Sequence, residues 1–293
     1  MDWTRFDGLV ESALREDHAR KDVTTAALVG EGMECQATLL AKQEGVISGL
    51  GLAQHICALF NPGLDLSPRR EDGDAVQEGT VLAAIEGPAR ALLSVERTLL
   101  NFLQRLSGTA TLTARFVRKV EGTGARILDT RKTTPGWRAL EKYAVRCGGG
   151  TNHRMDLEEQ VLIKENHLKL WRREKGQGGA AEDSVPAEAV RVARSAAGDL
   201  LVEIEVETIE QVRQVLPADP DILLLDNMSP AQIGEVKQLL RQQTSRERAP
   251  LLEASGGISL RNVEAYARAG VDRISVGALT HSAPVLDVSI LVE

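Results

Sequence analysis

The second half of the chain alternates short apolar strands with amphipathic helices, and this alternation limits the fold more than any other feature. The six expected strands span 126–129, 161–164, 201–206, 222–226, 251–255 and 273–277. Helical patterns lie between most of them, over 187–196, 209–216, 230–240 and 261–270. Strands that alternate with helices imply right-handed crossovers and a parallel sheet. Because six strands are fewer than the eight of a closed barrel, this pattern alone is compatible with both an open and a closed barrel.

The first part of the chain, residues 1 to about 95, has a different pattern. Alternating runs at 35–42 and 79–87 are separated by turn sequences such as Asn-Pro-Gly and Glu-Asp-Gly-Asp. Such a mixture is typical of an α+β domain.

A long helix is expected to join the two halves, from about Ser94 to Val120. Leucines at 99, 103 and 106 fall within about 60° of one another on this helix and form its core stripe. The opposite side is predicted to carry Arg97, Asn101, Gln104 and Gly108. On helix geometry alone, the simplest interpretation of Arg97 is a solvated charge.

Composition excludes several classes of protein. The formal net charge of −7 argues against nucleic acid as the main partner. No apolar stretch approaches the roughly 20 residues that a membrane span needs, and the N-terminal residues lack a signal-peptide core. The three cysteines are widely spaced and build neither a disulfide framework nor a metal knuckle. We therefore expect a cytoplasmic protein in a reducing compartment.

Cationic side chains gather where the expected strands end. Thr130, Arg131 and Lys132 follow the first strand, His153 and Arg154 follow three glycines (148–150), and Lys164 ends the next strand. Such a glycine run can bring the backbone close to a ligand. Barrel active sites are built at the carboxyl ends of strands. Scattered surface cations are the alternative, but the concentration favours one pocket for carboxylates and phosphates.

Acidic residues mark the next two strands. Glu203, Glu205 and Glu207 alternate with valine and isoleucine, so in a barrel strand they face the interior. Buried carboxylates need cations, a metal or hydroxyl groups. Glu205 and Asp226, which ends the following strand, could hold Mg²⁺ or sugar hydroxyls. An antiparallel strand with one wet face would alternate in the same way.

Glycine-rich turns follow the last two strands. Ser255, Gly256 and Gly257 come after one, and Gly277 and Ala278 come after the other. Phosphate sits at such turns in parallel barrels. His281 lies one helical turn beyond, where a packing role is the simpler interpretation. Residues 172–184 are expected to form a surface loop, either a plain connection or a lid.

Several of these segments resemble the successive motifs of one family. DTRKTTPG, EKYAVRCGGGTNHR, LIKENH, VEIEVE, LLDN, ASGG and VGALTH look like the signatures of quinolinate phosphoribosyltransferase, also called nicotinate-nucleotide pyrophosphorylase (carboxylating). DVTT (22–25) and ERTLLNFLQRLSG (96–108) extend the resemblance over nearly the whole chain. Departures are minor: Glu165, Trp137 and Ala254 stand where the family commonly has other residues, and no pocket charge is lost.

The resemblance implies a reaction and a fold. Quinolinate and phosphoribosyl pyrophosphate would give nicotinate mononucleotide, pyrophosphate and CO₂ with Mg²⁺ and no organic cofactor. The implied fold is an N-terminal α/β sandwich domain (1–108, with the start of the linking helix) and an open α/β barrel of fewer than eight strands (109–277). Residues 278–293 would pack back on the N-terminal domain. The implied assembly is a homodimer in which Arg97 completes the partner's active site.

The resemblance also implies roles for single residues. Arg131, His153, Arg154 and Lys164 resemble the quinolinate pocket, with Lys132 near both substrates. Glu205 and Asp226 resemble the ribose and metal carboxylates, and together with Lys132 and Lys164 they form the expected catalytic set. The remaining substrate-binding residues, which include the 5′-phosphate end, are Thr130, Ser255, Gly256, Gly257, Val276, Gly277, Ala278 and His281.

Other functions fit parts of the same pattern. A related phosphoribosyltransferase could act on another acceptor, although a pocket for two carboxylates favours quinolinate. A barrel lyase could use Lys132 or Lys164 as a Schiff-base nucleophile. A non-catalytic sensor of phosphorylated metabolites would have no need for the interior carboxylates.

Overall fold

The computed structural model describes residues 1–175, 185–242 and 249–293 and divides the chain into two compact units. We call the first the N-terminal unit; it consists of Met1–Ala114, Thr133–Gly150 and Leu279–Glu293. The second, the barrel unit, consists of Arg115–Lys132 and Thr151–Ala278. The N-terminal unit thus includes residues 133–150, which the sequence motifs had placed with the barrel.

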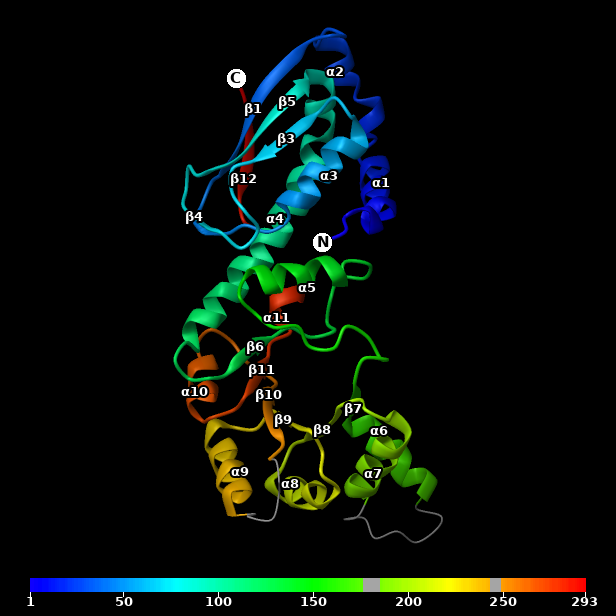
Figure 1. The fold of residues 1–293 in the computed structure, drawn as a ribbon, viewed down its shortest axis with the longest axis vertical. Helices are drawn as coiled ribbons and strands as arrows, with labels where there is room; N and C mark the ends of the chain where they lie inside the picture. The colour runs from blue at the N-terminus through cyan, green and yellow to red at the C-terminus, as the bar shows by residue number, and fades with distance from the viewer. Residues whose placement is uncertain (176–184, 243–248) are drawn as a thin grey trace. The chain divides into compact units, whose positions relative to one another are not determined.

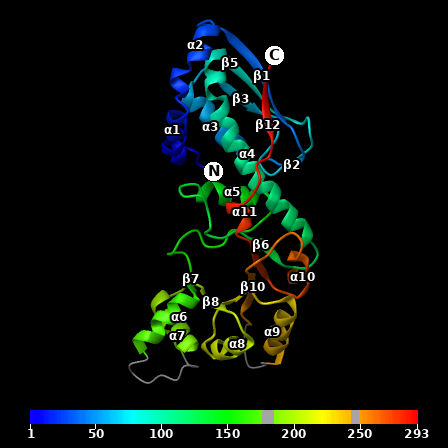
Figure 2. The ribbon, with the colours of Figure 1, turned by 180° about the vertical axis from the view of Figure 1, so that it is seen from behind.

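The N-terminal unit is built on a four-stranded antiparallel sheet in the order β12-β1-β5-β3. Helices α1, α3 and α4 lie on one side of this sheet (Figures 1 and 2), and apolar side chains from all of them form its core. Its strands are β1 (Glu34–Ala41), β3 (Asp65–Pro68), β5 (Val81–Pro88), β12 (Val288–Val292) and the short pair β2 (Gly45–Val46) and β4 (Ala75–Val76). Its helices are α1 (Asp7–Glu16), α2 (Val23–Leu28), α3 (Leu50–Phe60), α5 (Arg138–Cys147), α11 (Ala278–His281) and most of α4 (Ala89–Lys119).

Helix α4 confirms the expected long helix and begins five residues earlier than its pattern suggested. The predicted core leucines at 99, 103 and 106 are fully buried, whereas Arg97 and Asn101 are exposed. Gln104 and Gly108, predicted on the side opposite the core leucines, are covered by another segment of the chain. The Gln104 side chain donates a hydrogen bond to the Val288 carbonyl over 2.8 Å. A Cβ at Gly108 would lie 2.0 Å from the Pro284 carbonyl oxygen, so the C-terminal segment covers this stretch of the helix.

The C-terminal segment completes the N-terminal sheet. Strand β12 pairs antiparallel with β1, so residues more than 240 positions apart in the chain lie side by side (Figure 2). Gly148 lies close to the same long helix, because a Cβ there would meet the Ala110 carbonyl oxygen at 2.3 Å. Gly150 would likewise place a Cβ 2.7 Å from Cγ2 of Thr113, so Gly148 and Gly150 let the chain after α5 approach α4, and their smallness serves packing within this unit.

The barrel unit holds a six-stranded parallel sheet in the order β6-β11-β10-β9-β8-β7. Its strands are β6 (Arg126–Leu128), β7 (Val161–Ile163), β8 (Val202–Val206), β9 (Ile222–Asp226), β10 (Leu251–Ser255) and β11 (Arg273–Ser275). Its helices are α6 (Glu165–Lys175), α7 (Val185–Ala197), α8 (Ile209–Val215), α9 (Pro230–Gln242) and α10 (Val263–Arg268). All six predicted strands are confirmed. Strands β6 and β7 stand at the two edges of the sheet and are not paired with each other in the described residues, so the arrangement is open rather than closed.

Two further expectations concern the surface and the thiols. Residues 172–175, assigned to a loop from their composition, form the last turn of α6, while 176–184 lie outside the described residues. All three cysteines are free. Within the described ranges, no helix is both long and apolar enough to cross a membrane.

Candidate active site

A pocket of about 440 Å³ opens at the carboxyl ends of the barrel strands. Every one of the six strands, or the residues that directly follow it, contributes to the pocket wall. The lining residues are Thr130, Arg131, Lys132, His153, Arg154, Leu162, Lys164, Glu205, Leu224, Asp226, Glu253, Ser255 and Ser275. The structure therefore brings together the cations that sequence analysis placed at separate strand ends.

Arg154 is fixed at both its backbone and its side chain. Its Nη1 donates a 2.7 Å hydrogen bond to the Gln160 carbonyl, and its backbone N–H donates to Nδ1 of His153 over 2.7 Å. Burial lowers the pKa of the Arg154 guanidinium, and the nearby positive charge of Arg131 lowers it further. Two guanidinium groups held this close gain most from an anion that pairs with both.

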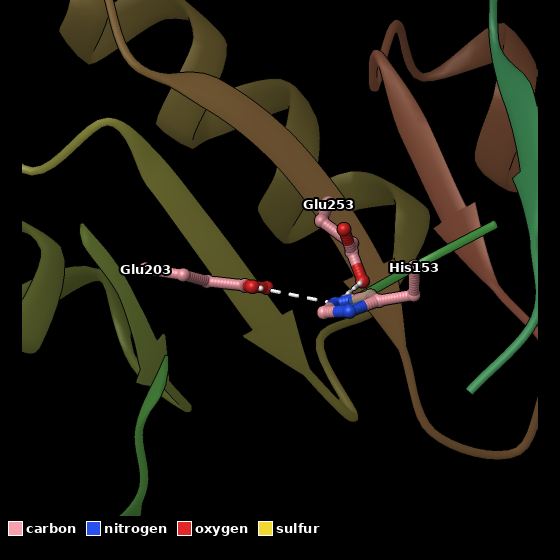
Figure 3. Close-up of side chains that lie close together, drawn as sticks. All are labelled: His153, Glu203 and Glu253. Atoms are coloured by element: carbon pink, nitrogen blue, oxygen red, sulfur yellow. Dashed lines mark ion pairs between the residues drawn. The ribbon is translucent and has the colours of Figure 1, made fainter. Parts of the chain in front are cut away.

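Behind the cations lies a group that we call the buried cluster: His153, Glu203 and Glu253 (Figure 3). Nε2 of His153 lies 3.3 Å from a carboxylate oxygen of Glu203 and 3.3 Å from one of Glu253. Both glutamates are fully buried, and the imidazole is 6% exposed. Burying two carboxylates costs several kcal/mol each unless cations and hydrogen bonds compensate.

Neighbouring side chains supply much of that compensation. The Gln160 side-chain amide donates to Glu203 over 2.6 Å. Nε of Arg273 lies 2.6 Å from Glu253, close enough for an ion pair but outside hydrogen-bond geometry. Burial and the charge of Glu253 raise the pKa of Glu203. Glu253 keeps a lowered pKa, because His153 and Arg273 outweigh its burial. Glu253 is accordingly the more strongly ionised partner.

The protonation of His153 is subject to opposing influences. Burial lowers the pKa of the His153 imidazole, but hydrogen bonds to Glu203 and Glu253 and the charges of these carboxylates raise it and favour a proton at Nε2. The Arg154 amide acts in the opposite direction, since Nδ1 accepts its N–H and cannot carry a second proton while it does so. In the geometry of this structure we assign the single proton to Nε2, where it faces both carboxylates.

A second acidic group, the rim cluster, consists of Glu205, Glu207 and Asp226. Their carboxylate oxygens lie within 4.8 Å of one another, Glu207 is exposed, and the other two are half-buried. Burial raises the pKa of Glu205, the charge of Asp226 raises it further, and Lys164 partly opposes both. Oxygen ligands from adjacent carboxylates are the donor set that Mg²⁺ prefers, so the residues present fit that ion.

The glycine turn after β10 is shaped for close approach. Gly256 has φ +91°, and a Cβ there would lie 2.2 Å from Oδ1 of Asn227. Asn227 itself has φ 55°, and its N–H donates to the Ser255 carbonyl over 2.9 Å. Gly257 follows at φ +59°. Val276, Gly277 and Ala278 follow β11 in the chain without lining the pocket themselves.

Two expected site residues lie in the other unit. Arg97 is exposed on α4 and borders a separate cavity of about 360 Å³ within the N-terminal unit. His281 ends α11 and is exposed, with Nδ1 2.6 Å from the Ser282 hydroxyl. Neither lines the barrel pocket in the described residues.

Sequence reasoning missed several residues of the site, including the pocket-lining Leu162, Leu224 and Ser275. Glu253 lines the pocket and Gln160 lies behind it, while buried Asp129 accepts hydrogen bonds from the Asn152 side chain and the His153 amide. Glu253 could have been found, because it precedes Ser255 by two positions and therefore shares its face of β10. The Gln160 contact depends on a loop and left no periodic signal.

The fold and the pocket together define a class of protein. An open parallel α/β barrel with clustered cations beside paired carboxylates at its strand ends is the arrangement of an enzyme for multiply charged anionic substrates. Comparisons with known proteins narrow this class. The family model described as quinolinate phosphoribosyl transferase, C-terminal domain, matches residues 109–291, and the corresponding N-terminal domain model matches residues 22–107. The chain belongs to the quinolinate phosphoribosyltransferase family.

Relatives agree over nearly their full length. The chain is 41% identical over 284 residues to nicotinate-nucleotide pyrophosphorylase [carboxylating] of Mycobacterium leprae, covering 96% of this chain and 95% of that one. It is 39% identical over 290 residues to the probable enzyme of that name from Bacillus subtilis, covering 99% and 94%. The structure of nicotinate-nucleotide pyrophosphorylase from Francisella tularensis aligns with a TM-score of 0.88 and 33% identity, covering 100% of this chain and 98% of that one.

Proposed function

We propose that this protein transfers the phosphoribosyl group of 5-phosphoribosyl 1-pyrophosphate to quinolinate, giving nicotinate mononucleotide, pyrophosphate and CO₂, a step of NAD biosynthesis. The observation that carries the proposal is the pocket itself, where Arg131, Arg154 and Lys164 meet beside Glu205 and Asp226. The named relatives catalyse, by their titles, a carboxylating nicotinate-nucleotide pyrophosphorylase reaction, which is the same reaction written in reverse.

The cationic side of the pocket suits the acceptor. Quinolinate carries two adjacent carboxylates on a pyridine ring, and Arg131, Arg154 and Lys164 supply positive charge for both. Arginine grips a carboxylate through paired N–H donors, and lysine adds a compact charge. Thr130 shapes the neighbouring turn, since its hydroxyl accepts the Lys132 N–H over 3.0 Å. Lys132, at that turn, would reach both substrates.

The acidic side of the pocket suits the phosphoribosyl donor. Glu205 and Asp226 would bind the ribose hydroxyls and hold Mg²⁺, which neutralises charge on the pyrophosphate. Ser255, Gly256 and Gly257 after β10, and Val276, Gly277 and Ala278 after β11, would receive the 5′-phosphate through backbone N–H groups.

The proposed reaction needs no organic cofactor. The bond between ribose C1 and the pyrophosphate oxygen breaks, and its electron pair leaves with pyrophosphate. The pyridine nitrogen donates its lone pair to C1, so the ring becomes cationic. The bond from the ring to the adjacent carboxylate then breaks, CO₂ leaves, and the electron pair stays on the ring carbon, which takes a proton. The positive ring nitrogen stabilises these electrons, so the substrate is its own electron sink.

We also propose a homodimer in which Arg97 serves the partner's pocket. Arg97 is exposed on the outer side of α4, and an exposed guanidinium can reach a second chain across a two-fold axis. Arg97→Ala should stay folded and lose most activity, and so should Lys164→Ala. Each heterodimer of the two variants would have one intact site and one site that lacks both side chains. At statistical exchange half of the dimers are mixed, so about a quarter of all sites should be active. Proven exchange without recovery would contradict shared sites.

A direct assay tests the function. Purified protein with quinolinate and the phosphoribosyl donor should release pyrophosphate and CO₂ in equal amounts, and removal of Mg²⁺ by a chelator should stop both. Absence of either product with folded protein would contradict the proposal. Borohydride trapping of a substrate adduct on Lys132 or Lys164 would indicate a lyase instead.

The free thiols fit a cytoplasmic location, which we propose for the enzyme.

A further inference from the structure

His153 lines the pocket, but the hydrogen-bonding atoms of its ring are directed into the protein. Nε2 lies between the buried carboxylates of Glu203 and Glu253 (Figure 3). Nδ1 accepts the N–H of Arg154 over 2.7 Å. An imidazole has two ring nitrogens, and both are occupied by these contacts. A substrate carboxylate would have to displace one of them.

A metal ion does not account for this cluster either. The nitrogen and the two carboxylates lie close enough together to hold an ion. A histidine that binds a metal through Nε2 carries its proton on Nδ1 and donates it to a neighbour. Here Nδ1 faces the N–H of Arg154, which is itself a donor. The surroundings of the ring therefore favour a proton at Nε2 shared between two carboxylates.

Arg154, in contrast, presents an unsatisfied guanidinium to the pocket. Within the described part of the chain its side chain makes one hydrogen bond, to the Gln160 carbonyl. Most of its five N–H donors remain for a ligand. The contacts of the buried cluster lead to this residue: His153 holds its backbone, and Gln160 holds both its side chain and Glu203.

We propose that His153 is a positioning residue, anchored by Glu203 and Glu253, which fixes the backbone of Arg154 so that Arg154 contacts the acceptor carboxylate. The proposal rests on the proposed function, in which Arg154 binds quinolinate. It gives Glu203, Glu253 and Gln160 a role in acceptor binding without any contact to the substrate. The groups around the imidazole come from separate elements: Asp129 after β6, Glu203 on β8, Glu253 on β10 and Arg273 on β11.

A double-mutant cycle separates positioning from direct contact. The kcat/KM for quinolinate is measured at saturating donor for His153→Ala, Arg154→Lys and the double variant. If His153 acts through Arg154, the double variant loses much less than the product of the two single losses. The matched control cycle pairs His153→Ala with Lys164→Arg, and there the fold-losses should multiply. Multiplying losses in both cycles would overturn the proposal.

A conservative substitution provides the second readout. In His153→Asn, Oδ1 can take the acceptor place of Nδ1 and keep the Arg154 amide in position. The kcat/KM for quinolinate should therefore be at least tenfold higher in His153→Asn than in His153→Ala. The KM for the phosphoribosyl donor should be unchanged in both variants. A direct substrate contact through Nε2 would leave Asn as poor as Ala, which would contradict the proposal even if His153→Ala were partly unfolded.

A third readout is independent of activity. Nitrogen-15 NMR of the wild-type protein near pH 7.5 reports the protonation of each of its five histidines, and the His153 signal is the one that His153→Asn removes. We expect a proton on Nε2 and none on Nδ1. A doubly protonated ring would overturn the proposal. If the wild-type protein were inactive but carried the His153 proton on Nε2 alone, the result would contradict the proposed function. It would still support the anchoring of Arg154 by His153.

Discussion

Glu203 and Glu205 lie two residues apart on β8 and on the same face of the strand, yet they have different surroundings. Glu203 is fully buried and contacts His153 and Gln160. Glu205 is half-buried, lines the pocket and lies next to Asp226 and Glu207. One step of the strand repeat, about 7 Å, separates a carboxylate buried against His153 and Gln160 from one that lines the pocket.

The same comparison holds for the two clusters as wholes. The buried cluster pairs its acids with an imidazole and with Arg273, so its charges are compensated within the protein. The rim cluster collects three carboxylates whose mutual repulsion a bound cation would relieve. A cluster that is neutralised internally suits positioning, and one that lacks neutralisation suits binding of a metal ion or a ligand.

The largest expected effect concerns the acceptor. Nicotinate lacks the second carboxylate, so part of the positive charge of Arg131, Arg154 and Lys164 would stay unpaired when it binds. A site built for a charged group rejects an analogue without it by about 10⁴-fold. We expect kcat/KM for nicotinate to be lower than that for quinolinate by that order. Comparable values for the two acids would show that the cationic side does not select the acceptor.

Stability should distinguish the clusters next. Glu253→Ala removes the carboxylate that contacts buried His153 and pairs with Arg273, and breaking a buried ion pair costs about 3–5 kcal/mol. Glu205→Ala removes a half-exposed carboxylate from a repulsive group and should change the unfolding free energy by less than about 1 kcal/mol. Urea denaturation of both variants measures the difference. Equal destabilisation would remove the distinction drawn between the clusters.

Turnover should show the reverse pattern. Asp226→Ala removes a rim carboxylate that the proposed function places at the ribose and the metal, and losses on the order of 10²–10³-fold in kcat are expected for such electrostatic groups. Quinolinate binding should change little. A parallel loss of quinolinate affinity would mean that the rim carboxylates organise the cationic pocket instead. Glu210→Gln, at an exposed position in α8, is the matched control and should behave as wild type.

Much of this comparison could be predicted from the residue pattern. Period-2 alternation placed Glu203, Glu205 and Glu207 on one face, and the strand–helix alternation predicted all six barrel strands. The alternation could not distinguish Glu203 from Glu205, because burial depends on what lies opposite. His153 and Glu253 each lie 50 positions from Glu203 in the chain, one before it and one after it, and no local pattern encodes that meeting.

Failures of prediction have similar causes. Gln104 and Gly108 appear polar and open in helical projection, but a segment about 180 residues later covers them. The three glycines at 148–150 suggested close approach to a ligand, whereas the approach in the structure is to α4. Both errors reflect long-range packing, which helix geometry and composition do not contain.

Side-by-side kinetics of Glu203→Gln and Glu205→Gln tests the central claim most directly. Both variants neutralise one carboxylate on the same strand face, and kcat/KM is measured separately for quinolinate and for the phosphoribosyl donor. The account predicts that Glu203→Gln mainly lowers the value for quinolinate, through loosened His153 and Arg154. Glu205→Gln should mainly lower the value for the donor and alter the Mg²⁺ dependence. Identical profiles for the two variants would contradict the division between a positioning cluster and a substrate-binding rim.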